Sequence, residues 1–325
     1  IGTGYANAIV NPFQDNMPMR GEVAFDDVQL KVFKPFIKDV RSMAGTLALA
    51  GKVNGTLTQP QFTGEMRLKD GAISMMSLPV NLTNIQLYSS IRQDSASIDG
   101  AFNSGQGVGR LKGSFDWKEE PHLALTLKGD NLLIRQAPMI TAIVQPDLSL
   151  DVYPFDQRLS LKGSIDVPRA RISMPETTAT VINVSPDVRV VQQGQDLLAT
   201  LKSAKPWDIR ANMTLTLGNQ VVFQGFESNI PLVGRLHLSQ RGLETAMRAN
   251  GAIGVSQKVK IEAYGQSLDL NRAIARFNGP LANPTLDIDA NKPVQGSMVG
   301  VRVTGTATVP NVQVYNDAGL SEQEA

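Results

Sequence analysis

The sequence predicts an all-β fold, a long one-sided antiparallel sheet accompanied by one or two short helices. First, apolar and polar residues alternate through most of the 325 residues, which is typical of strands with one buried face and one wet face. Second, a Gly-x-x-x-x-Pro motif recurs between alternating segments, at residues 55–60, 163–168, 279–284 and 305–310. Because proline cannot donate to a β-ladder, it marks the starts and edges of strands. We therefore expect one strand-turn unit to be used repeatedly.

Several segments show the alternation most clearly, and each is expected to form a strand. These are residues 66–69, 85–88, 123–128, 148–152, 159–162, 213–217, 259–263 and 301–304. Glycine, asparagine and aspartate fall between them, at residues 129–131, 218–219 and 250–251. Turns at intervals of roughly 8–12 residues indicate consecutive antiparallel hairpins. No linker rich in proline, glycine or serine interrupts them, so we expect one continuous architecture.

Two segments depart from the alternation. In residues 35–43, Phe36, Ile37, Val40 and Met43 recur at helical spacing after a proline suited to a first helical position. We expect a short amphipathic helix there. Residues 137–145 are expected to form either a second short helix or an irregular apolar loop.

Composition and charge exclude several classes of function. Apolar residues make up 42% of the chain and charged residues 19%, which is ordinary for a folded protein. The 31 basic and 30 acidic residues are interleaved and leave a net charge of +1, so no basic face suited to nucleic acid is expected. Cysteine is absent, which excludes disulfides and thiolate metal sites. No apolar run approaches the roughly 20 residues that a membrane-spanning helix needs.

The sequence contains no recognisable set of catalytic residues. The two histidines, His122 and His237, stand far apart without carboxylates at metal-ligand spacing. The glycines of residues 105–109 precede an alternating strand instead of a helix, so they predict a bulge or a close strand contact, not a nucleotide site. Asp287 and Asp289 share an outward face, where a solvated surface is favoured over a cation site. We expect no enzyme activity, no cofactor and no metal.

The inward-facing residues are aliphatic, and aromatic residues make up only 6% of the chain. Such a face can pack as a sealed core or line an open groove, and the sequence leaves both alternatives open. The candidate groove-lining residues are Leu123, Leu125, Leu127, Leu148, Leu150, Leu159, Leu161, Met213, Leu215 and Leu217.

The later part of the chain resembles the TamB C-terminal domain family. The residues that carry the resemblance lie at 163–172, 185–188, 263–268, 277–280, 284–288 and 299–306, with Pro310. Residues 45–71 resemble a repeat that this family shares with the wider AsmA-like group. We accordingly divide the chain into an AsmA-like repeat region, residues 1–150, and a TamB C-terminal region, residues 151–325. Residues 271–273 and 315–319 depart from the family pattern, and its final apolar segment is missing.

The resemblance implies a protein of the periplasm, anchored in the inner membrane by segments outside this chain. It implies a curved, taco-like trough with an apolar interior, and a C-terminal part that engages TamA, an outer-membrane barrel of the BamA class. The family is implicated in carrying phospholipids toward the outer membrane and was earlier linked to assembly of outer-membrane proteins and autotransporters.

We therefore expect a phospholipid conduit that docks on an outer-membrane barrel, with no nucleic acid as partner. Val301, Val303, Val312 and Val314 are expected to form or border the edge that pairs with the barrel, because no later strand follows them in the sequence. One alternative is a scaffold that offers strand edges to unfolded barrel proteins. Another is a structural β-array with a sealed core.

Overall fold

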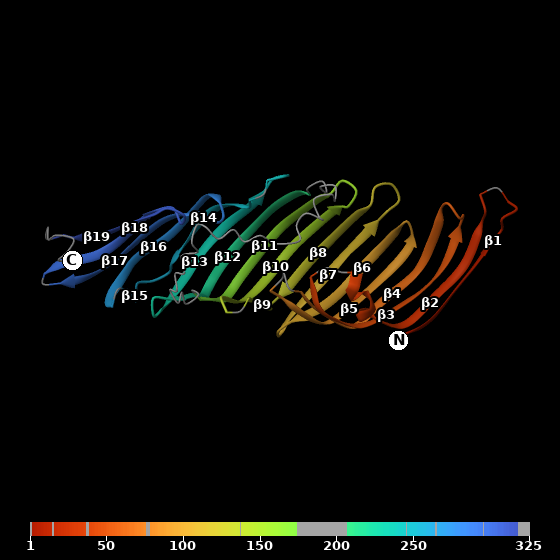
Figure 1. Cartoon of the computed structure of the whole chain (residues 1–325), viewed down its shortest axis with the longest axis horizontal. Helices are drawn as coiled ribbons and strands as arrows, with labels where there is room; N and C mark the ends of the chain where they lie inside the picture. The colour runs from red at the N-terminus through yellow and green to blue at the C-terminus, as the bar shows by residue number, and fades with distance from the viewer. Residues whose placement is uncertain are drawn as a thin grey trace, which may run out of the picture.

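The computed structural model describes residues 2–317, apart from residues 15, 37–38, 76–78, 137, 174–206, 245, 264 and 295. Nineteen strands form a single long, curved, open sheet (Figure 1). The strands are β1 Thr3–Val10, β2 Met19–Gln29, β3 Val40–Gly55, β4 Pro60–Met75, β5 Asn81–Gln93, β6 Ser95–Ser104, β7 Gly107–Asp116, β8 His122–Asp130, β9 Leu132–Gln136, β10 Ile140–Tyr153, β11 Arg158–Ser173, β12 Asp208–Gly225, β13 Ser228–Gln240, β14 Arg248–Val255, β15 Val259–Ala263, β16 Gln266–Pro280, β17 Thr285–Val294, β18 Ser297–Gly305 and β19 Pro310–Asn316.

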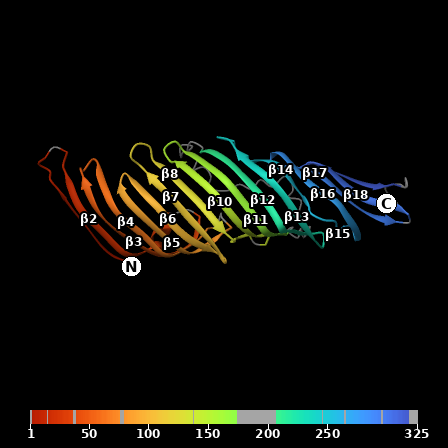
Figure 2. The same cartoon turned by 180° about the vertical axis from the view of Figure 1, so that it is seen from behind.

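Neighbours in the sequence are neighbours in the sheet almost throughout, and they pair antiparallel. The strands therefore follow one another along the long axis, with β1 at one end and β19 at the other, as both views show (Figures 1 and 2). β8 and the short β9 lie end to end along β10, and β14 and β15 lie in the same way along β16. β11 and β12 pair parallel. The predicted all-β fold with a long antiparallel sheet is confirmed.

The glycine–proline motif closes a hairpin at three of its four positions. β3 ends at Gly55 and β4 begins at Pro60, and β18 and β19 meet in the same way at Gly305 and Pro310. Both of these glycines have positive φ, 93° and 85°, which a side chain would resist. Residues 279–284 connect β16 to β17.

The fourth copy of the motif is not a turn, and the prediction there is wrong. β11 continues through residues 163–168, and its register against β10 and β12 shifts around Pro168. A β-bulge of this kind accommodates a residue that cannot donate to the ladder. Gly163 is needed for close approach, because a Cβ there would lie 2.0 Å from the carbonyl oxygen of Asp147.

The helix predicted for residues 35–43 is also corrected. The chain has a 3-10 helix, η1, but it spans Leu30–Phe36 with Pro35 inside it, and Ile37 lies outside the described residues. Asp39 has a φ of 66°, and Val40 and Met43 belong to β3, opposite residues of β4. Pairing along all of β3 satisfies far more backbone hydrogen bonds than two further helical turns would, so the sheet overrides the local pattern.

Residues 140–145 are likewise strand, neither helix nor irregular loop. They begin β10, which pairs with β9 on one side and with β11 on the other. Ala142 and Val144 are buried on one face, and this period of two is the signal that the sequence interpretation missed.

The glycines of residues 105–109 make close strand contacts, as predicted. Gly105 lies in the turn that joins β6 to β7. A Cβ at Gly109 would lie 2.2 Å from the ring of Phe102, and one at Gly107 would lie 2.1 Å from the backbone of Asn131.

Candidate functional site on the apolar face of the sheet

The register of the sheet places apolar residues in a continuous row across its strands. Residues that pair directly between neighbouring strands project from the same face. One such row, which we name the central apolar row, crosses the sheet from β3 to β16. Its members, each paired with the next, are Leu47, Leu68, Leu87, Gly100, Leu111, Leu127, Leu148, Gly163, Met213, Leu238, Ala249 and Gly279.

The neighbouring register positions form the opposite face, which is polar. The row next to the central apolar row consists of Arg67, Tyr88, Asp99, Lys112, Thr126, Ser149, Lys162, Asn212 and Ser239, again each paired with the next. The sheet therefore has an apolar face and a polar face over most of its length. Eleven steps between strands, at about 4.8 Å each, make the central apolar row roughly 50 Å long.

All ten candidate lining residues project from the apolar face. Leu127, Leu148 and Met213 belong to the central apolar row itself. Leu125, Leu150 and Leu161 form a parallel row in direct register. The remaining four lie on the same face, because Leu123 and Leu159 both pair with Val152, and Leu215 and Leu217 follow Met213 at alternate positions of β12.

All of these ten residues except Met213 are half-buried, and contact with the buried clusters divides them into two groups. Met213 is buried, in a cluster with Ala211, Leu236, Leu238 and Ala249. A second buried cluster lies on β9–β12. Four further candidates pack against one or both clusters: Leu148, Leu161, Leu215 and Leu217. The others are half-buried and belong to no buried cluster: Leu123, Leu125, Leu127, Leu150 and Leu159. The face is therefore wetter around β8 than around β12.

The same difference extends along the molecule. Among the described residues before β9, Val40 is the one buried apolar side chain, whereas buried apolar side chains recur from Leu132 to Val299. The N-terminal strands therefore present a partly solvated apolar surface. Sequence reasoning did not single out the members of the central apolar row on β3–β7, because a pairing register cannot be read from one strand.

Several ion pairs lie on the polar face. Arg67 lies 2.7 Å from Glu65, and Lys112 lies 3.4 Å from Asp99. The Arg210 guanidinium donates two hydrogen bonds to the carboxylate of Asp208, which lowers the pKa of that carboxyl and raises the pKa of the arginine. Partial loss of hydration, and then the neighbouring Glu65, raises the pKa of Tyr88.

The two aspartates of β17, Asp287 and Asp289, form ion pairs with arginines. The carboxylate of Asp287 lies 2.9 Å from the guanidinium of Arg272 and 3.2 Å from that of Arg276, and the carboxylate of Asp289 lies 3.4 Å from the guanidinium of Arg302. Both carboxylates share the polar face, as predicted, and their charge is neutralised there. Within the described residues, no group of three or more histidine, aspartate or glutamate side chains could hold a metal ion.

The two histidines lie on separate strands, His122 on β8 and His237 on β13. The ring of His122 stacks on Tyr153 at 4.4 Å, and its Nε2 lies 3.1 Å from Asp151. His237 projects from the polar face of β13, opposite Asn250 of β14.

The C-terminal edge is formed by β19, which in the described part of the chain pairs with β18 alone. Val301 faces Val314 and Val303 faces Val312, so the four predicted edge residues meet on the apolar face. Val312 is 53% exposed and Val314 42% exposed. An outermost strand presents unpaired backbone groups that another chain can extend.

Comparisons with known proteins match this chain to two domains of one family. A family model described as the TamB C-terminal domain matches residues 93–325, and a model of the TamB N-terminal domain matches residues 2–68. The translocation and assembly module subunit TamB of Haemophilus influenzae is 22% identical over 331 residues, which cover 97% of this chain and 25% of that protein. The chain thus spans a quarter of that relative's length. The single described helix is too short to cross a membrane. Because the first family model covers well over half of its residues, the chain belongs to the TamB family.

Proposed function

We propose that this chain is part of a periplasmic bridge, anchored in the inner membrane elsewhere in the protein, whose apolar face carries phospholipids between the two membranes. The observation that carries the proposal is the central apolar row, in which no polar side chain interrupts the path from β3 to β16. We propose that the curvature of the sheet makes this face the inner wall of a trough.

The chemistry of the row suits acyl chains in transit. Each methylene group removed from water contributes about 0.8 kcal/mol, so an aliphatic wall can hold a lipid tail without polar recognition. A conduit requires this low specificity, because strong polar contacts would trap the lipid at one position. We propose that the ten candidate lining residues on β8–β12 form one section of the wall and that the half-buried ones contact the lipid.

Phospholipid that remains with the purified protein tests this function. The intact chain, isolated from a Gram-negative envelope without detergent, is expected to yield phospholipid on solvent extraction and mass spectrometry. A soluble protein of similar size from the same envelope is the control for carry-over. Lipid at the background level of that control would contradict the proposal.

We further propose that the C-terminal edge docks on an outer-membrane barrel, which the family resemblance identifies as TamA. The support is the position of β19 as the outermost described strand and the exposure of Val312 and Val314. Docking by strand addition needs the backbone donors and acceptors of that edge. Prolines at Val303 and Val314 disrupt the last two strands while leaving β1–β16 intact.

The expected result is that Val303→Pro with Val314→Pro abolishes capture of the protein by purified TamA. Ile9→Pro is the matched control, because Ile9 is an exposed apolar residue on the opposite edge strand, β1. It is expected to bind like the wild type. Equal capture of both variants would exclude docking through β19.

The alternative function is a scaffold for assembling outer-membrane proteins or autotransporters by β-augmentation. The exposed edge at β19 favours it, since such an edge can accept a strand from an unfolded barrel as readily as from a folded one. Binding of barrel-derived peptides by a chain that carries no lipid would favour the scaffold over the conduit.

A further inference from the structure

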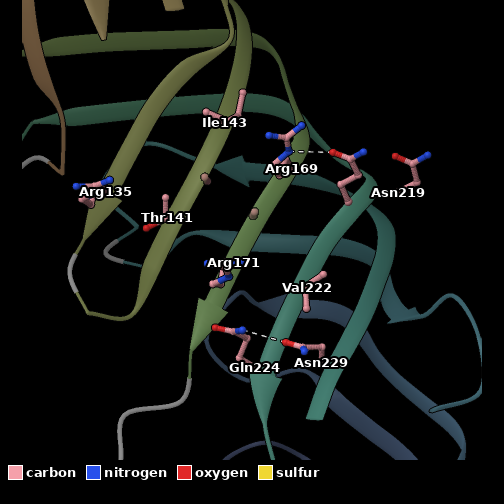
Figure 3. A pocket seen from close by; sticks show the side chains of 12 residues that line it. Arg135, Thr141, Ile143, Arg169, Arg171, Asn219, Val222, Gln224 and Asn229 are labelled. Atoms are coloured by element: carbon pink, nitrogen blue, oxygen red, sulfur yellow. Dashed lines mark hydrogen bonds between the residues drawn. The ribbon is translucent and has the colours of Figure 1, made fainter. Parts of the chain in front are cut away.

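A hollow of about 700 Å³ lies on the polar face of the sheet, over β9–β12. Figure 3 shows Arg135 from β9, Thr141 from β10, Arg169 and Arg171 from β11, and Val222 from β12 around it. We name this site the arginine hollow. Sequence reasoning missed it, because the three arginines come from two strands that only the register brings together.

The arginine hollow carries three positive charges and no negative one. No carboxylate lines it, and none of the ion pairs within the described residues includes Arg135, Arg169 or Arg171. On the same face, Arg67 and Arg210 are each paired with a carboxylate. Like charges gathered in one concave site repel one another, so the arrangement favours an anionic ligand that neutralises them.

The spacing of the three arginines allows them to converge on one group. Arg135 and Arg171 are both in register with Thr141, from opposite sides, which sets their backbones about 10 Å apart. Arg169 and Arg171 are separated by one residue on β11 and project from the same face about 7 Å apart. Arginine side chains reach across such distances, and the hydroxyl of Thr141 lies between them as a further donor.

Two other features prepare the site for an oxyanion. The Nε of Arg169 donates a hydrogen bond to the side-chain oxygen of Gln220 at 2.9 Å, which orients the guanidinium and leaves its two terminal nitrogens available. Half-buried Ile143 and Val222 add apolar surface to the lining, and the exposed arginines are open to a ligand from solvent. A planar guanidinium matches the oxygens of a phosphate group.

We propose that the arginine hollow binds a phosphate-type oxyanion, the group shared by an anionic phospholipid headgroup and by free phosphate. The site lies on the opposite face from the central apolar row, so it is independent of the acyl-chain proposal. A negative result on lipid tails at the apolar face does not contradict oxyanion binding in the arginine hollow. Absence of oxyanion binding does not contradict the acyl-chain proposal.

The test compares two triple variants of the intact chain that remove the same charge from the same face. The first variant, Arg135→Gln with Arg169→Gln and Arg171→Gln, removes the three positive charges of the arginine hollow. Arg67→Gln with Lys112→Gln and Arg210→Gln is the control, because each of these residues is already paired with a carboxylate. Binding is measured at low salt to inorganic phosphate by calorimetry, and to phosphatidylglycerol vesicles by sedimentation, with phosphatidylcholine vesicles as the neutral reference.

The hollow variant is expected to bind at least about tenfold more weakly, since three charge-assisted hydrogen-bonding groups are lost, while the control binds like the wild type. Binding of the vesicles identifies a headgroup as the source of the phosphate, and binding of phosphate alone identifies a soluble anion. Equal weakening of both variants, or wild-type protein that binds neither probe, would overturn the proposal. If the triple variant does not fold, Arg171→Gln against Arg67→Gln gives the same comparison with a smaller effect.

Discussion

Leu125→Arg is expected to leave the protein folded and to lower its bound phospholipid more than about tenfold. Leu125 projects from the apolar face between Gly113 and Leu150, is half-buried and belongs to no buried cluster. An arginine there can lay its stem on the wall and keep its guanidinium in water. The charged group nevertheless displaces methylene groups from the wall, at about 0.8 kcal/mol each, which accounts for the loss of lipid.

The control for this variant is Thr126→Arg, one residue along β8 on the polar face, where Thr126 is exposed. Lipid extraction and thermal unfolding are measured on the same samples. Thr126→Arg is expected to match the wild type in both. Equal lipid content in the two variants would show that the wall at β8 does not contact the bound lipid.

Leu215→Arg is expected to destabilise the protein by several kcal/mol and to melt far below the wild type or aggregate. Leu215 packs against two buried clusters, one on β9–β12 and one on β12–β14. An unpaired charge in such surroundings costs several kcal/mol, which is a large share of the roughly 5–15 kcal/mol that stabilises a typical domain. Thr216→Arg, which projects from the other face, is expected to melt close to the wild type.

If the Leu215→Arg and Thr216→Arg variants unfold at the same temperature, the apolar face at β12 is as open to solvent as it is at β8. The sequence alone places Leu125 and Leu215 in the same candidate lining and does not distinguish them. The structure separates them, because a cluster buried around Met213 and Leu236 occupies the apolar face near Leu215.

Much of the fold could be predicted from alternation and punctuation. The strands around Leu123–Leu127 and Met213–Leu217 were predicted from the period of two, which depends only on the geometry of an extended chain. The turns at Gly55 and Gly305 were predicted because a glycine that tolerates positive φ, followed by a proline, specifies a turn without help from distant residues. The turn predicted at residues 163–168 was wrong, because a β-bulge accommodates the same motif where neighbouring strands continue on both sides.

The remaining features depend on pairing partners, which a single strand does not specify. Residues 35–43 have helical spacing, yet β4 provides a partner over the whole of β3 and the strand prevails. The apolar face could be predicted for each strand separately, whereas the central apolar row follows only from the register. The arginine hollow depends on the register in the same way. The boundary placed between residues 150 and 151, and the lipid and barrel contacts of the candidate residues, stay predictions.

A lipid path along the apolar face from β4 to β8 is the central proposal, and site-specific photo-crosslinking tests it most directly. A photoreactive amino acid is placed in turn at Leu68, Leu87, Leu111 and Leu127, which belong to the central apolar row. The matched polar-face positions are Arg67, Tyr88, Lys112 and Thr126. After irradiation in intact envelopes, phospholipid adducts are counted by mass spectrometry. The account predicts adducts at every row position and background levels at the polar positions. Adducts that are equal on the two faces, or absent from the row, would contradict it.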